Sequence, residues 1–299
     1  MHTVPFTVAV AADAPPGDTV FALVGTTEHA SCTTLAQVTV DLQATLQVDP
    51  AAIPASTTWP GIGDWSFAHV SVQWNPPECQ GQLQIVDIEP LAGYVPLDMG
   101  TLTRIDATTW RYDAFTEPQT EKCPRRARVW IAAIQGEVEL GRIGIVVRPI
   151  HEWLTTGHKH GPGQPMHSPD LTHFMMNYDY LRWKYSTVLA TTGGAFSSVS
   201  FKNASCVECT IGIFNSPCVA ACTDSNNNVV FVTSAFTGTE NAAASMIGHE
   251  LIHTTGADEC PAYTWEFNND NLTGIFPCDP GYLADVVRNM NCRCNGICP

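Results

Sequence analysis

The chain has 299 residues, 44% of them hydrophobic, and Asp and Glu outnumber Lys and Arg by 29 to 14, for a net charge of −15 at pH 7. This excess of negative charge disfavours binding to nucleic acids, whose phosphates it would repel. No apolar run approaches the roughly 20 residues that span a membrane, and the chain is long enough for two globular domains.

Residues 1–150 have the pattern of an all-β domain. Segments rich in β-branched and aromatic residues recur at regular intervals, with Pro, Gly and Asp at the turns between them. The expected strands lie at residues 4–10, 19–24, 36–48, 65–74, 82–88, 104–112 and 128–147. Short strands at this spacing predict an antiparallel β-sandwich, similar to an immunoglobulin domain. No charge cluster or aromatic face marks a binding site, so we expect an accessory domain with a structural or substrate-docking role.

Residues 151–169 are the expected linker to a second domain. The segment contains His158, His160 and His167 among several Gly and Pro residues. These histidines could bind a second metal ion. The density of Gly and Pro favours an exposed linker whose histidines only titrate.

The second expected domain, residues 170–299, mixes helices and strands and includes a cysteine-rich tail. A long amphipathic helix is predicted from Ser168 to about Ala190, and strands are predicted at residues 195–201 and 228–233. Thr237 and Glu240 have the spacing of a capping box that would begin another helix. These elements predict an α+β fold.

Twelve cysteines are many for a cytosolic protein, and nine of them lie after residue 205. This content indicates several disulfides and therefore a secreted protein, although the start of the chain lacks the basic and apolar segments of a secretory signal. The spacing of Cys206, Cys209, Cys218 and Cys222 also allows a structural zinc ion, but we favour disulfides. The tail, residues 292–299, is expected to be linked back to the second domain.

The segment 248–259 contains the pattern HExxH on the predicted helix. His249 and His253 are one helical turn apart, so both imidazoles can face one metal ion. Glu250 lies about 100° further round the helix, where its carboxylate can contact a water on that ion without binding the ion itself. The opposite, apolar face of the helix is formed by Ala243, Ile247 and Leu251.

Zinc needs a third protein ligand, and the carboxylates after the motif can supply it. Gly256 is expected to end the helix and reverse the chain, and Asp258 is expected to cap a second helix. Glu259 would then be the first residue of that helix and the favoured ligand, with Glu266 on the same face as the alternative.

The segment resembles the signature of zincin metallopeptidases. Residues 249–256 match the metzincin pattern HExxHxxGxx, and Glu259 stands where that family has its third histidine. Residues 259–263 also resemble the ExxAY helix of other HExxH proteins, whose glutamate is the third zinc ligand. The chain lacks the third histidine of the metzincins, and Met290 is the nearest downstream candidate for a Met-turn. The resemblance covers about twenty residues of the chain and implies a zincin-type catalytic domain.

These features predict a secreted zinc endopeptidase that hydrolyses a protein or peptide substrate. Zinc would activate a water, and Glu250 would take the proton of that water and pass it to the leaving amine. Tyr263 is a candidate donor to the oxyanion, or could serve only in packing or in a hydrogen bond to a ligand. One alternative is an adhesion or binding protein with a structural zinc ion, for instance bound by both Glu259 and Glu266. The other is an effector protease specific for one partner.

Overall fold

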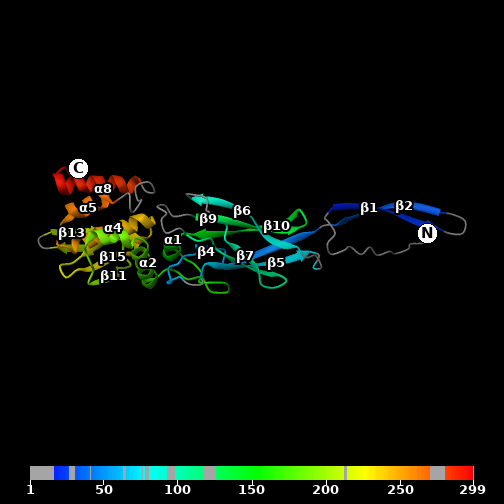
Figure 1. The fold of residues 1–299 in the computed structure, drawn as a ribbon, viewed down its shortest axis with the longest axis horizontal. Helices are drawn as coiled ribbons and strands as arrows, with labels where there is room; N and C mark the ends of the chain where they lie inside the picture. Colours follow the sequence, from blue (N-terminus) through cyan, green and yellow to red (C-terminus); the bar gives the residue numbers. More distant parts are fainter. Residues whose placement is uncertain are drawn as a thin grey trace.

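A computed structural model describes residues 17–26, 31–40, 42–62, 65–75, 77, 81–92, 98–117, 126–211, 214–269 and 280–298. The protein is a mixed α and β structure: strands dominate the described part of the first half, and all helices among the described residues lie in the second. Figure 1 shows an elongated molecule with the helices at one end, two sheets in the middle and the hairpin β1–β2 at the other end.

The hairpin pairs β1 (Gly17–Thr26) with β2 (Ser31–Val40) in an antiparallel register. The sequence places strands at residues 19–24 and 36–48, whereas the structure has β2 and then a separate strand, β3 (Gln43–Asp49). The predicted strand at residues 4–10 lies outside the described residues.

Two four-stranded sheets follow, with the orders β3-β5-β8-β7 and β4-β10-β9-β6. All their pairs are antiparallel except β4–β10. The remaining strands are β4 (Ala52–Pro54), β5 (Phe67–Asn75), β6 (Gln82–Ala92), β7 (Thr101–Arg104), β8 (Thr109–Asp113), β9 (Arg126–Gln135) and β10 (Val138–Arg148). Side chains alternate along these strands, because successive residues of a strand point to opposite faces of a sheet. Val70 of one sheet and Ile131 of the other are both fully buried in one shared hydrophobic core.

The second half contains a three-stranded sheet of order β11-β15-β14. β11 (Ser198–Lys202) runs parallel to β15 (Asn228–Val232), and β14 (Ala221–Thr223) pairs antiparallel at the edge. In the sequence, the hairpin of β12 (Val207–Ile211) and β13 (Phe214–Val219) comes between β11 and β14. The helices of this half are α1 (Ile150–Thr155), α2 (Leu171–Lys184), α3 (Ser186–Leu189), α4 (Glu240–His253), α5 (Glu259–Asn268) and α8 (Pro280–Asn295), with short 3₁₀ turns η2 (Ala190–Thr192) and η3 (Thr233–Phe236).

The core of the second half also takes residues from the first. It joins residues of α1, α2, β15, α4 and α5 into one cluster, to which the loop between β4 and β5 contributes Trp59 and Ile62. Trp59 and Ile62 come from the first half but are buried in the core of the second. Their burial removes apolar area from water and so stabilises the contact between the two halves.

The expectation of an exposed linker at residues 151–169 is wrong for residues 151–162, which are buried or half-buried except Gly157, whereas residues 163–166 are exposed. α1 lies at its start, with Trp153 and Leu154 fully buried, and His158 is only 3% exposed. A helix of six residues is too short to produce a recognisable period in the sequence, so the Gly and Pro residues that follow it dominate the pattern.

Two helix boundaries also differ from expectation. Asp170, not Ser168, caps α2 by accepting hydrogen bonds from the backbone N–H groups of Thr172 and His173, and α2 ends at Lys184. α4 is capped by Thr239 and not by Thr237, because the Glu240 side chain forms an ion pair with Lys184 instead of closing a capping box.

Four disulfides join described residues, as the cysteine content predicts: Cys206–Cys218, Cys209–Cys222, Cys260–Cys294 and Cys292–Cys298. The first two occupy the cysteines that could otherwise have held a structural zinc ion. The third connects α8 to α5, which links the tail to this half as expected. These bonds indicate an oxidising environment. Within the described ranges, every helix is too short or too polar to cross a membrane.

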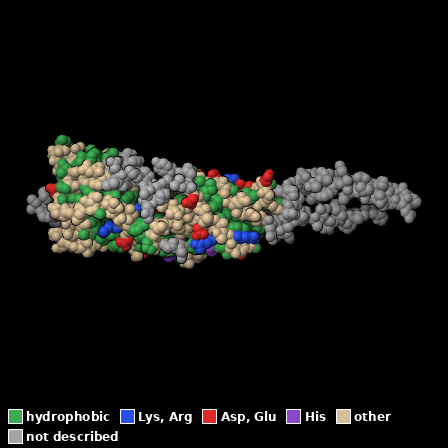
Figure 2. All heavy atoms as spheres, in the orientation of Figure 1, with side chains coloured by type: hydrophobic (Ala, Val, Ile, Leu, Met, Phe, Trp, Pro, Cys, Tyr) green, Lys and Arg blue, Asp and Glu red, His purple; other side chains and the backbone are tan. Residues whose placement is uncertain are grey.

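Charged side chains over the sheets occur in small mixed groups. On the face drawn in Figure 2, acidic and basic side chains of the described residues lie next to one another above the strands. Arg128 pairs with Glu89 across β9 and β6, and Arg142 pairs with Glu139 along β10. Exposed pairs of this kind contribute little to stability.

Candidate metal centre

α4 carries the HExxH motif on a helix that the core holds firmly. Ala243 and Ile247 are fully buried and Leu251 nearly so, as the apolar stripe predicts. The helix ends at His253, and Gly256 follows with a φ of +80°, a left-handed conformation that glycine adopts at no steric cost. The chain therefore turns back immediately after the second histidine.

α5 begins directly after this turn. Asp258 caps it by accepting a hydrogen bond from the Cys260 backbone N–H, and Glu259 is its first residue, as the sequence predicts. Glu259 Oε2 lies 3.3 Å from His249 Nε2 and 3.9 Å from His253 Nε2. The two imidazole Nε2 atoms are 3.2 Å apart. The structure thus brings His249, His253 and Glu259 together.

These three ligand atoms could hold a single metal ion. Each residue offers one atom, and all of these atoms lie within 4.8 Å of one another. Ligands about 2.0–2.1 Å from zinc at tetrahedral angles are about 3.3–3.4 Å apart, close to two of the three separations found here. Two imidazoles and one carboxylate occupy three of the four tetrahedral positions, which leaves the fourth for a water or a substrate atom.

Each imidazole is oriented by an acceptor at its other nitrogen. His249 Nδ1 lies 2.5 Å from Glu266 Oε1, and His253 Nδ1 lies 3.0 Å from the Ala257 carbonyl oxygen. An acceptor at Nδ1 places the hydrogen there and leaves the Nε2 lone pair free for a metal. Glu266, the alternative ligand in the sequence, therefore contacts the far side of the His249 ring and not the side that faces Glu259.

Glu266 is itself held by two hydroxyl groups. The Ser245 hydroxyl donates to Glu266 Oε2 at 3.0 Å, and the Tyr282 hydroxyl donates to the same oxygen at 2.5 Å. Ser245 is on α4 and Tyr282 is on α8, so this carboxylate joins three helices behind His249.

The charges around His249 favour a cation. Burial lowers the pKa of His249, but hydrogen bonds to Glu259 and Glu266 outweigh burial and raise the pKa to about 10. The hydrogen bond with His249 lowers the pKa of Glu259, even though burial opposes this. The negative potential that holds a proton on His249 would equally attract a divalent metal ion.

Glu250 faces a pocket of about 320 Å³ beside these groups. Its Oε2 accepts a hydrogen bond of 2.6 Å from the Thr223 hydroxyl on the edge strand β14. The pocket is lined on one side by Val219, Ala221 and Thr223 and on the other by Glu250, His253 and Glu259. This volume suits one or a few side chains of a ligand.

Tyr263 packs against the site through its ring. The ring lies edge-on to His249, with centroids 4.6 Å apart. Burial and the neighbouring carboxylates, first Glu259, raise the pKa of Tyr263 well above its ordinary value. Its hydroxyl is therefore protonated at neutral pH. The contact with His249 is the packing role expected as one of its alternatives.

Three residues near the site have no signal in the sequence. Thr223, Tyr282 and Arg293 reach it from β14 and α8, and Arg293 lines the pocket and lowers the pKa of Glu259. Their separation from the motif along the chain hides them, because periodicity reports only neighbours on one element.

Comparison with known protein families, with curated proteins and with solved structures found no match for this chain.

Proposed function

We propose that this protein is a zinc-dependent endopeptidase that hydrolyses peptide bonds in protein or peptide substrates. The observation that carries the proposal is the position of Glu250. It follows His249 in the sequence and lines the pocket beside the cluster of His249, His253 and Glu259. A metal bound only for structure would not need a carboxylate held beside it at the edge of a pocket.

His249, His253 and Glu259 would hold the ion. When bound, zinc lowers the pKa of a water ligand and polarises a carbonyl group. Glu250 accepts the proton of the attacking water and returns it to the leaving amine. Thr223 keeps the Glu250 carboxylate on the pocket side, and Glu266 keeps the His249 ring in place. Tyr263, which remains protonated, is our candidate for a donor to the oxyanion.

Zinc with four protein ligands would favour an adhesion or binding protein instead. Glu266 lies at Nδ1 of His249 and bonds Ser245 and Tyr282, so it supports a ligand and does not compete for the ion. This arrangement supports an open site with three protein ligands, which is the form that catalysis needs.

We infer two finer features of the architecture. The shared core of the two four-stranded sheets supports an immunoglobulin-like β-sandwich in residues 1–150. The order of the sheet β11-β15-β14 followed by α4 and α5 supports a zincin-type catalytic domain in residues 170–299. The four disulfides support a secreted protein.

The test is Glu250→Gln in the full chain, compared with Glu137→Gln at an exposed turn between β9 and β10. Glu250→Gln removes the base without removing a ligand, so we expect zinc content to be unchanged and cleavage of a peptide library to fall by about 10²–10⁴-fold. Glu137→Gln should match the unaltered chain in both measurements. Full cleavage by Glu250→Gln would overturn the proposed role.

A further inference from the structure

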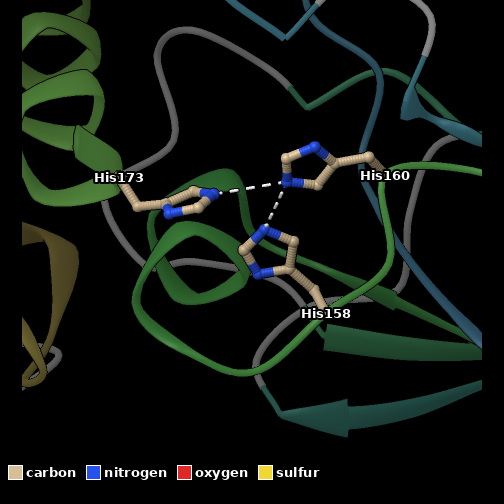
Figure 3. A group of neighbouring side chains, drawn as sticks. All are labelled: His158, His160 and His173. Atoms are coloured by element: carbon tan, nitrogen blue, oxygen red, sulfur yellow. Dashed lines mark hydrogen bonds between the residues drawn. The ribbon is translucent and has the colours of Figure 1, made fainter. Parts of the chain in front are cut away.

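A second group of histidines converges at the junction of the two halves. We call His158, His160 and His173 the junction cluster. Figure 3 shows His158 and His160 on the loop between α1 and α2 and His173 on the first turn of α2, with their rings pointing toward one another. His160 Nε2 lies 3.2 Å from His158 Nε2 and 3.2 Å from His173 Nε2.

These separations are close to the about 3.3–3.4 Å between nitrogen atoms that share a tetrahedral zinc ion. All three ligand atoms lie within 4.8 Å of one another. Two of the rings are also packed on tryptophans: Trp65 stacks on His160 at 4.3 Å between centroids, and Trp153 contacts His158 at 3.8 Å. Packing accounts for the ring planes, but it does not require three Nε2 atoms to meet.

Two of the imidazoles have acceptors at Nδ1. His158 Nδ1 lies 2.6 Å from the Thr156 carbonyl oxygen, and His173 Nδ1 lies 3.0 Å from Asp170 Oδ1. The Asp170 backbone N–H also approaches His173 Nδ1, at 3.3 Å, but the carboxylate is nearer and charged, so it favours a hydrogen on Nδ1. Both Nε2 atoms then present lone pairs to the centre of the cluster, as they do in metal sites.

A hydrogen bond network alone satisfies this arrangement poorly. His160 Nε2 is the one nitrogen left to carry a hydrogen, and it would have to share that hydrogen between His158 and His173. A cation interacts favourably with all three lone pairs at once.

We propose that the junction cluster binds a second transition-metal ion, zinc in the first instance, through the three Nε2 atoms. Three imidazole nitrogens suit zinc or a neighbouring transition metal and do not suit calcium or magnesium, which prefer oxygen ligands. The proposal does not depend on peptidase activity, because no residue of the junction cluster belongs to the centre on α4 and α5.

The ion would fasten the junction of the two halves. The loop that carries His158 and His160 is already joined to the end of β3, where Asp49 accepts hydrogen bonds from the Lys159 ammonium group at 2.6 Å and from the Gly163 backbone N–H at 2.5 Å. Binding His173 to the same ion would connect this loop to α2. The role of the ion is therefore structural, and its loss should lower stability.

The experiment counts metal ions in four forms of the full chain, each loaded with Zn²⁺ and then separated from free ion. We expect about two zinc ions in the unaltered chain and about one in His253→Ala, which lacks a ligand of the first centre. His253→Ala combined with His160→Gln should hold none. His253→Ala combined with His167→Gln is the matched control and should still hold one, because His167 stacks on His160 without belonging to the cluster.

A spectrum and a melting curve guard against misfolded variants. Co²⁺ bound to His253→Ala should give the intense visible bands of a four-coordinate site, and His160→Gln should abolish them while the far-ultraviolet circular dichroism is unchanged. Added Zn²⁺ should raise the melting temperature of His253→Ala by several degrees and leave the double variant unchanged.

The outcomes separate the two proposals. The junction site is overturned if His253→Ala holds no zinc. It is also overturned if the variant that combines His253→Ala with His160→Gln still holds zinc. If the unaltered chain holds one ion that persists in His253→Ala and is lost when His160→Gln is added, the junction site stands and the proposed peptidase centre fails.

Discussion

The Glu250 carboxylate owes its position to one hydroxyl group. Glu250 is 6% exposed, and its Oε2 accepts the 2.6 Å hydrogen bond from Thr223. A hydrogen bond to a charged acceptor is worth about 1.5–3 kcal/mol when it is lost. That range corresponds to roughly ten- to hundredfold in a rate if the bond is needed in the transition state.

Thr223→Val should therefore lower kcat by about ten- to a hundredfold, since it removes the donor and nearly preserves the shape of the side chain. KM and zinc content should change little, because Thr223 is not among the proposed ligands. Thr223→Ser, which keeps the hydroxyl, should restore most of the rate. Equal losses in the two variants, measured by steady-state kinetics on a cleaved peptide, would show that packing and not the hydrogen bond matters.

At the scale of elements, the approach of α4 to α5 depends on the absence of a side chain at Gly248. A Cβ atom there would overlap the indole ring of Trp265. The ring cannot easily move away, because Trp265 is 8% exposed and its Nε1 donates a 3.0 Å hydrogen bond to the Thr191 hydroxyl. Gly248 thus lets Glu259 come close to the histidines of α4.

Gly248→Ala should destabilise the protein by about 1–3 kcal/mol, because the overlap outweighs the roughly 1 kcal/mol that alanine gains over glycine within a helix. It should also weaken zinc binding at least about tenfold by separating α5 from α4. Gly238→Ala is the control, since a Cβ atom there meets no atom within 4 Å. Chemical denaturation and zinc titration measure both effects, and an unchanged zinc affinity would contradict this explanation.

Two disulfides hold α8, and they close loops of different length. Cys260–Cys294 spans 34 residues, and Cys292–Cys298 spans 6. The loop-entropy relation gives about 4 kcal/mol for the first and about 2 kcal/mol for the second. Replacing both cysteines of a pair by serine should therefore lower stability about 1.5 kcal/mol more for Cys260–Cys294. Denaturant titrations of the two double variants test this, and equal losses would argue against the loop-entropy explanation.

The sequence predicts those parts of the site that lie on one helix or next to it. Helical spacing places His249 and His253 together, and the helix-stop glycine and the Asp258 cap correctly predict where α5 begins. It does not predict Thr223 or Tyr282, which approach through tertiary packing. It also assigns the histidines at residues 158–167 to an exposed linker, because the sequence does not show that Trp65, from a distant segment, and Trp153, on α1, pack on His160 and His158.

At the scale of the whole molecule, a buried ion cluster joins the two halves. Lys184 of α2 lies 2.7 Å from Glu117 Oε1, which follows β8 in the first half, and 2.5 Å from Glu240 Oε1 of α4. All three side chains are at most 5% exposed. Burial raises the pKa of Glu117, while the Lys184 charge acts in the opposite direction.

Lys184→Met should cost about 3–5 kcal/mol, because it leaves two carboxylates buried without a cation. The pKa of Glu117 would rise further above its ordinary value of 4.5. When the pKa of a carboxyl group is higher in the folded than in the unfolded state, the protein loses stability as pH increases. The stability deficit of Lys184→Met should therefore be smaller at pH 5 than at pH 8. Arg288→Met, at the exposed pair with Asp285, is the control and should change stability by at most about 1 kcal/mol at either pH. A deficit independent of pH would contradict the assignment.

The Glu266 contacts also bear on when the candidate metal centre can form during synthesis. A ribosome delivers α4 before α8, so His249 leaves it before Tyr282 and Cys294, the residues that hold Glu266 and α5 from behind. The bond between Cys260 and Cys294 forms only where thiols are oxidised. For the secreted peptidase proposed above, both histidines would lack this support until the bond forms, and hydrolysis would be delayed until the chain reaches an oxidising environment.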